Sequence, residues 1–187
     1  VGFCVFVPVG RQWWAFTRGR FIRVPAARLW VLEYFRHFVP PRGGLVFDVG
    51  GELGRETAQF ARLVGPQGKV LTFECLPAHV EHLKRVASHW PNVQVVERAC
   101  WDHATELEFF SGHTPGSGTA VPTACGQTGQ ELADRSKGLI RVQAQTLDNL
   151  WSAHANRRPV DFLKMDIEGA EYEALEGASE MLRHTRM

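Results

Sequence analysis

Residues 45–54 read LVFDVGGELG, an apolar run that ends at two adjacent glycines, Gly50 and Gly51. A short apolar run bounded by turn residues is typical of a strand that is buried on both faces, as in a parallel sheet. Glycines after such a strand let the backbone turn sharply and approach a ligand, and the helix that follows presents free N–H groups. The stretch therefore predicts a strand, a turn and a helix that border a ligand site.

The same alternation of strand and helix continues along the chain. The predicted strands after the first are 70–74, 93–96 and 161–166, and the predicted helices are 56–64, 79–89 and 171–182. Strands that alternate with helices at this spacing form right-handed βαβ units. The pattern predicts an α/β fold with a mostly parallel sheet in a three-layer sandwich.

Between these units the alternation breaks. Residues 106–110 and 139–144 have the pattern of two further strands, which flank a stretch rich in Gly, Ser, Thr and Pro, 111–129. Loops of that length are uncommon, and are usually either functional or disordered.

The N-terminal segment, residues 1–43, differs from the rest in charge. It holds seven arginines, no lysine and one acid, Glu33. Residues 28–39 have helical periodicity, and the apolar run 1–9 is either a buried strand or the end of a signal or membrane segment. We favour a helix packed on the next domain with solvated arginines, over contact with anionic lipid. The predicted division is an N-terminal extension, 1–43, and a main domain, 44–187.

Composition excludes several classes of protein. The chain has 187 residues, of which 44% are hydrophobic and 22% charged, unlike a disordered, collagenous or coiled-coil chain. The formal net charge is +1, which implies no nucleic-acid partner. No apolar run approaches the ~20 residues of a membrane span. Its four cysteines form no CxxC pair, which favours a reducing compartment, the cytoplasm.

Two candidate ligand residues follow the first two strands. Asp48 precedes the glycine turn, where Glu52 and Arg55 replace the glycines of a dinucleotide-binding GxGxxG pattern. An acid there suits a positively charged ligand, such as a sulfonium amino acid, better than a pyrophosphate. Glu74 ends the second strand, where a carboxylate can accept both hydroxyls of a ribose. Alone, each could be an ordinary turn or strand end.

The third candidate segment is DFLKMDIEGAE, residues 161–171. A lysine inside a strand covered on both faces must be paired, so Lys164 belongs to a structural ion pair or to a tuned catalytic pair. Asp166, Glu168 and Glu171 gather where the strand leads into the helix. Acids at a helix N-terminus are also ordinary partners of the helix dipole, and for Glu171 that alternative stays open.

Together these residues resemble the FkbM family of S-adenosylmethionine-dependent methyltransferases. The resemblance spans roughly residues 45–182 and rests on VFDVGGELG (46–54), VLTFECLP (70–77), TLD (146–148) and DFLKMDIEGAEYEALEGA (161–178). It implies a Rossmann-like class I methyltransferase fold and methyl transfer to a hydroxyl of a sugar, glycolipid or polyketide-type acceptor.

When the motifs of the family are matched to this sequence, the resemblance implies roles for individual residues. The cofactor-binding residues are Asp48, Gly50, Gly51 and Gly54 for the methionine part, Glu74 for the ribose, and Ala99 and Cys100 beside the adenine. Asp166 is the expected general base or hydroxyl-orienting group, with Glu168 and Glu171 as alternates and Lys164 tuning the cluster. Two residues depart from the family, Glu52 in place of Asn and Cys75 in place of Pro.

Three further expectations complete the prediction. Folds of this type continue with about three more strands, so the chain has the pattern of a domain truncated after its fourth core strand and helix. The strand 161–166 would then be a bare edge. A metal is not expected, because His79 and His82, the histidines with the nearest ligand spacing, fit a solvated helix face. The rival functions are a catalytically silent interaction module and a nicotinamide-dependent oxidoreductase.

Overall fold

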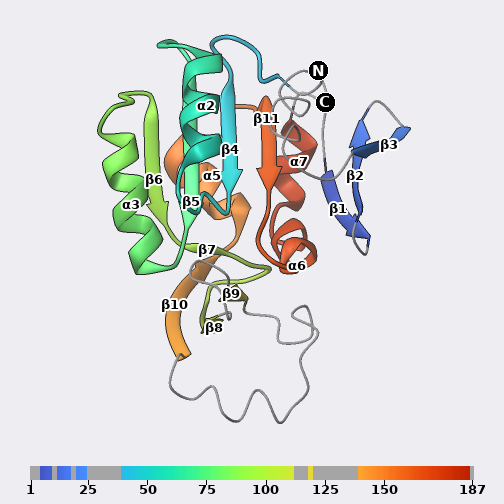
Figure 1. Cartoon of the computed structure of the whole chain (residues 1–187), viewed down its shortest axis with the longest axis vertical. Coiled ribbons are helices and arrows are strands. Elements are labelled where there is room, and N and C mark those ends of the chain that lie inside the picture. The colour runs from blue at the N-terminus through green and yellow to red at the C-terminus, as the bar shows by residue number, and fades with distance from the viewer. Residues whose placement is uncertain are drawn as a thin grey trace.

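The main sheet has four parallel strands and forms the centre of the molecule (Figure 1). The computed structural model describes residues 5–9, 12–17, 20–24, 39–111, 118–119 and 139–185. In spatial order the strands are β11 (Phe162–Met165), β4 (Leu45–Val49), β5 (Lys69–Glu74) and β6 (Val93–Glu97). Each pair is parallel, as the sequence predicts.

Helices cover both faces of this sheet. On one face α2 (Arg55–Val64) packs Phe60 against Val46 and Val70. On the other face, α5 (Leu147–Ala155) and α7 (Ser179–His184) pack Trp151 and Met181 against Phe47. The third core helix, α3 (Pro77–Ala87), connects β5 to β6. The predicted three-layer, Rossmann-like α/β fold is confirmed.

The strand order positions a ligand site. From β4 the chain continues to β5 and β6 on one side, whereas β11 lies on the other side of β4. In open α/β sheets, ligands bind at the carboxyl ends of the strands, at the point where the strand order reverses. Here that point lies between β4 and β11.

A second, smaller sheet lies beyond the carboxyl ends of the main sheet (Figure 1). Its order is β7 (Ala99–Cys100), β10 (Leu139–Gln145), β8 (Thr105–Ser111) and β9 (Gly118–Thr119). β10 pairs antiparallel with β8 and parallel with β7. The two strands predicted at 106–110 and 139–144 are thus confirmed, and most of the predicted loop 111–129 lies outside the described residues.

The N-terminal segment contains a three-stranded antiparallel sheet of β1 (Val5–Val9), β2 (Gln12–Thr17) and β3 (Arg20–Val24). The strand alternative for the first apolar run is therefore confirmed over residues 5–9, and β2 and β3 were not predicted. The predicted helix 28–39 lies outside the described residues except for Val39. The domain boundary at residue 43 stays a prediction. No helix in the described part of the chain is long and apolar enough to cross a membrane.

The prediction of one helix over 171–182 is wrong. The structure has two short helices, α6 (Glu171–Glu176) and α7, separated at Gly177 and Ala178. A Cβ atom on Gly177 would lie 2.2 Å from the backbone oxygen of Trp101, so the chain passes too close to β7 for a side chain. Asp148 then accepts backbone N–H groups of Glu180 and Met181 at 3.0 and 2.6 Å, which favours a new helix start there.

The sequence analysis also missed a helix, α5. Thr146 is its N-cap and accepts the backbone N–H of Asn149 at 3.2 Å. Leu147 and Trp151 are fully buried in the main core. The family segment 146–148 therefore has a structural function, since it starts α5 and, through Asp148, also holds the start of α7.

β11 is an edge strand of the main sheet, as expected. It pairs with β4 on one side, and no other strand in the described ranges pairs with its second side. β1 of the small N-terminal sheet contacts β11 without joining its sheet.

Candidate active site

The glycine turn after β4 packs tightly against two neighbouring strands. The N–H groups of Gly50 and Gly51 donate to the Phe73 oxygen of β5 at 3.0 and 3.2 Å. Gly50 has a φ of 80°, which favours glycine. A Cβ atom there would lie 2.0 Å from the backbone oxygen of Asp166, after β11. The turn thus brings β5 and the segment after β11 to one place.

Lys164 and Asp48 form a buried ion pair beneath this turn. The Lys164 Nζ atom lies 3.3 Å from Asp48 Oδ1 and donates to the Gly50 oxygen at 2.6 Å. The second Asp48 oxygen, Oδ2, accepts the Thr57 hydroxyl at 2.6 Å. Burial lowers the pKa of Lys164, but the charges of Asp48, Asp166 and Glu56 outweigh burial and raise it. Lys164 is therefore charged, and the ion pair holds the turn between β4 and β11.

Glu74 ends β5 and is only 8% exposed. One carboxylate oxygen, Oε1, accepts the N–H groups of Cys75 and Leu76 at 2.8 and 3.0 Å. The other, Oε2, accepts the N–H of Glu52 at 3.0 Å. Since an ionised carboxylate has about four acceptor positions, this side chain is held rigidly while it retains capacity for a further donor.

Three acids that follow β11, Asp166, Glu168 and Glu171, form a cluster with Glu52 of the glycine turn. Burial raises the pKa of Glu168, and the charges of Asp166, Glu171 and Glu52 raise it further. Glu171 also accepts the backbone N–H of Ile167 at 3.0 Å, so it supports the turn before its own helix. The Lys164 charge is engaged by Asp48, and the exposed side of the cluster is therefore strongly negative.

Ala99 and Cys100 form β7, one residue after β6. Both side chains are buried, and Cys100 belongs to the main core. Burial raises the pKa of the Cys100 thiol, and the charges of Cys75 and Glu74 add to the increase. A buried thiol of this kind is unreactive, so any contact with a ligand would come from the backbone or the apolar surface.

The predicted site residues therefore meet at the carboxyl edge of the sheet. Glu52 connects the glycine turn to Glu74, and Gly50 packs against Asp166. Gly51 and Gly54 lie within the same turn, where added Cβ atoms would press on Leu83 of α3. The geometry brings these segments together; the individual roles assigned to them stay predictions.

Two residues that the sequence analysis did not assign to the site belong to its surroundings. Glu56 is half-buried in the first turn of α2, and burial raises its pKa while the charge of Lys164 lowers it. Its position directly after the glycine turn was the available signal. The interpretation of His79 as a solvated residue is wrong. His79 is buried, with its Nδ1 atom 3.5 Å from Glu74 Oε2, because α3 folds back over the end of β5.

Within the described part of the chain, no group of three or more His, Cys, Asp or Glu side chains is arranged to hold a metal ion. The acids after β11 are spread along a turn and a helix start.

Comparisons with known proteins identify the family of this chain. The model of the methyltransferase FkbM domain matches residues 48–187. The 2-O-methyltransferase NoeI of Sinorhizobium fredii is 23% identical over an alignment of 171 residues, and the match covers 88% of this chain and 70% of that protein. The methyltransferase sdnD of Sordaria araneosa is 28% identical over an alignment of 162 residues, and the match covers 75% of this chain and 62% of that protein.

A solved structure of a methyltransferase FkbM from Methylobacillus flagellatus is 16% identical, with a TM-score of 0.49. The match covers 80% of this chain and 36% of that one. The chain thus spans only part of the length of each of these relatives.

Proposed function

Because the chain belongs to the FkbM methyltransferase family, we propose that it transfers a methyl group from S-adenosylmethionine to a hydroxyl group. The observation that carries this proposal is the meeting of Gly50, Glu74 and Asp166 at the carboxyl edge, where the strand order reverses. A relative whose name describes a 2-O-methyltransferase supports oxygen as the acceptor atom.

The chemistry of the site fits this cofactor. S-adenosylmethionine supplies an electrophilic methyl group on a positively charged sulfur. The negative cluster of Glu52, Asp166 and Glu168 suits a cationic ligand, because the nearest buried cation, Lys164, is already engaged by Asp48. Glu74, held by three backbone N–H groups, has acceptor capacity left for a ribose hydroxyl.

In this proposal, one group of residues binds the cofactor, and another orients the acceptor hydroxyl and accepts its proton. The turn 50–54 and Glu74 hold the cofactor, with Ala99 and Cys100 beside the adenine. Asp166, exposed at the edge, orients the acceptor hydroxyl and accepts its proton, with Glu168 and Glu171 as alternates. Lys164 supports the turn from below, and its charge acts on Asp166. Methyl transfer from a sulfonium depends mainly on positioning, so the proton acceptor contributes a modest part of the rate.

The proposed acceptor is a small molecule or a glycan- or lipid-linked hydroxyl compound, such as a sugar, glycolipid or polyketide. The acidic cluster favours a neutral acceptor over an anionic one, since an anion there would meet Asp166 and Glu168. Contact of the N-terminal segment with a membrane, which such a lipid-linked acceptor would call for, stays the less favoured alternative to a helix packed on the main domain.

The test separates cofactor binding from turnover. We expect Glu74→Ala to weaken S-adenosylmethionine binding at least ~10-fold in calorimetric titration, because a charged acceptor of ribose hydrogen bonds contributes about 1.5–3 kcal/mol. We expect Asp166→Asn to bind the cofactor as the wild type does and to lose most of its methyl transfer.

Glu97→Ala is the matched control, because it removes an exposed strand-end carboxylate one strand away, on β6. Unchanged cofactor affinity in Glu74→Ala would refute the ribose role. An absence of heat with S-adenosylmethionine in the wild type would instead favour a silent module, and binding of a nicotinamide dinucleotide in its place would favour an oxidoreductase.

A further inference from the structure

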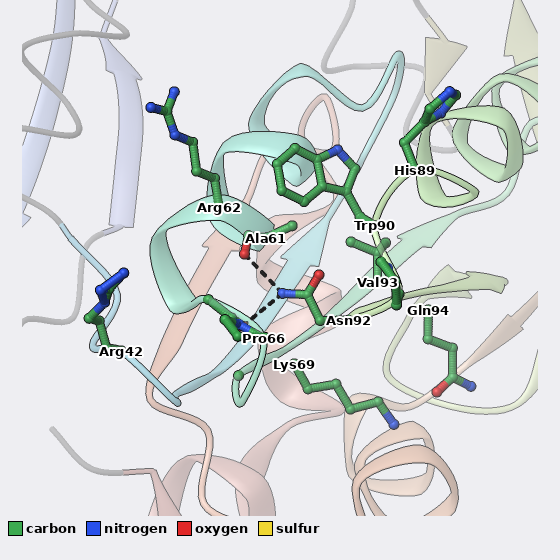
Figure 2. Close-up of a pocket in the computed structure, with 13 residues that line it drawn as sticks. Arg42, Ala61, Arg62, Pro66, Lys69, His89, Trp90, Asn92, Val93 and Gln94 are labelled. Atoms are coloured by element: carbon green, nitrogen blue, oxygen red, sulfur yellow. Dashed lines mark hydrogen bonds between the residues drawn. The ribbon is translucent and has the colours of Figure 1, made fainter.

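A hollow of about 710 Å³ lies at the other end of the main-sheet strands from the candidate active site, at the amino ends of β5 and β6 (Figure 2). Its lining includes Arg42, Arg62, Lys69, His89, Trp90 and Asn92. β5 starts at this hollow with Lys69 and ends at Glu74, so the two sites are separated by about 20 Å of strand. The volume is that of a small-molecule site and far exceeds what a single ion needs.

The charge of the hollow is positive, although the chain as a whole is nearly neutral. Four of the lining residues are basic or histidine, and none is acidic. Arg42 and Arg62 are exposed and have no acidic partner among the described residues. Lys69 donates to the backbone oxygen of His154 at 2.9 Å, which leaves its charge without a counter-charge. The hollow therefore attracts an anionic group.

Of the cations that line the hollow, Lys69 also lies close to a histidine, His154. Burial lowers the pKa of His154, and the charges of Lys69 and Arg98 lower it further. The Nδ1 atom of His154 lies 3.1 Å from the side-chain nitrogen of Gln94, another lining residue. The histidine is thus kept neutral beside a surplus of positive charge.

Two uncharged side chains, those of Trp90 and Asn92, also line the hollow. Trp90 is half-buried, and it packs against the core beneath α2 while part of its ring faces the hollow. Asn92 donates both hydrogens of its amide, to the oxygens of Ala61 at 2.9 Å and Gly65 at 3.0 Å. These bonds fix the orientation of the amide and leave its oxygen as an acceptor on the side of Trp90 (Figure 2).

We propose that this hollow binds a soluble sugar that carries a phosphate group, at a site separate from methyl transfer. A flat aromatic ring packs on the apolar face of a sugar ring, a fixed acceptor oxygen receives a sugar hydroxyl, and arginines bind phosphate through paired N–H donors. Trp90 and Asn92 supply the first two functions, and Arg42 and Arg62, which line the same hollow, supply the positive charge for the third.

The experiment measures binding of glucose 6-phosphate to the whole chain by calorimetric titration at low salt. We expect the double variant Arg42→Ser/Arg62→Ser to bind about tenfold or more weakly, since each charge-assisted contact to phosphate is lost. The control is Arg183→Ser, which removes an exposed arginine on α7, outside the lining. We expect that variant to bind as the wild type does.

Further probes test each part of the proposal. Trp90→Leu keeps an apolar group over the core but removes the ring, and we expect it to weaken the sugar phosphate more than inorganic phosphate. Glucose binding as tightly as glucose 6-phosphate would overturn the role of the arginines. Inorganic phosphate binding as tightly would overturn the role of the sugar ring.

Two measurements distinguish this hollow from a lipid-binding surface and from the carboxyl edge. Binding to vesicles that contain phosphatidylinositol phosphate, with none to glucose 6-phosphate, would overturn the proposal in favour of a lipid surface. Glu74→Ala should leave binding of glucose 6-phosphate unchanged, because Glu74 lies at the other end of β5. A loss in that variant would mean that the probe occupies the carboxyl edge, and this too would overturn the proposal.

Discussion

Glu52 has a left-handed backbone conformation, with a φ of 46°. Non-glycine residues rarely adopt this region, and asparagine tolerates it better than glutamate. The conformation is needed because the Glu52 N–H must point at Glu74 while the chain turns from β4 into α2. Asparagine, which the resemblance leads us to expect at this position, would therefore suit the backbone better than glutamate does.

We expect Glu52→Asn to stabilise the protein by about 0.5–1 kcal/mol in chemical denaturation, because asparagine relieves the strain of this position. The matched control is Glu52→Gln, which removes the same charge without the preference for a positive φ. Equal stabilisation by both variants would show that the gain comes from charge and not from the backbone.

The pair of Lys164 and Asp48 is the most deeply buried ion pair in the described part of the chain, with side chains 9% and 0% exposed. We expect Lys164→Met to destabilise the protein by about 3–5 kcal/mol, since it leaves Asp48 charged and unpaired in the core. The measurement is the free energy of unfolding in urea. Adding Asp48→Asn should recover part of the loss, and a double variant that is as unstable as the sum of the two single variants would contradict the pairing.

At the scale of elements, the helices differ in how far local patterns predict them. α2 and α3 follow from apolar periodicity next to Gly and Pro signals, and they lie within two residues of their predicted bounds. α5 is only nine residues long, so its capping threonine was the main local signal. The break between α6 and α7 depends on the approach of Gly177 to Trp101, which is a tertiary contact that no local pattern contains.

Asp148 connects two of these elements, because it lies in the first turn of α5 and accepts two N–H groups at the start of α7. We expect Asp148→Ala to lower the free energy of unfolding by about 1–2 kcal/mol, the usual loss for a helix cap. Thermal denaturation followed by circular dichroism measures it. Asp102→Ala removes an exposed turn carboxylate and is the control; a similar loss there would show that charge alone is responsible.

At the scale of the whole molecule, the acidic edge makes stability depend on pH. The folded-state pKa of Glu168 is raised from its ordinary value of 4.5, so the folded protein binds this proton more tightly than the unfolded chain does. Stability therefore falls as the pH rises from about 4.5 through the raised value, and stays lower above it.

We expect Glu168→Gln to raise the melting temperature near neutral pH by about 1–2 °C, a small gain because solvent screens this charge. The gain should disappear below about pH 4.5, where the wild-type residue is protonated in both states. Glu106→Gln, a variant of an exposed acid on β8, is the control. A gain that persists in acid would assign the effect to packing instead.

The sheet shows how far the whole architecture was predictable. Apolar runs located β4, β5, β6 and β11, and their alternation with helices predicted a mostly parallel sheet. The site followed from the sheet, because the predicted acids and glycines end adjacent strands. The small N-terminal sheet and the parallel pairing of β7 with β10 were not predicted, since both depend on contacts between segments with no distinctive local pattern.

The position of β11 beside β4 has a consequence for how the chain folds. Leu45 and Asp161, which are hydrogen bonded next to these two strands, are 116 residues apart. Contacts of such long sequence separation form late, because the loop between them must close first. During synthesis, β4 can pair with β5 soon after both emerge from the ribosome, but its other side waits until β11 follows. The nascent chain therefore exposes an apolar strand edge until β11 emerges, and this interval is when chaperones would be needed.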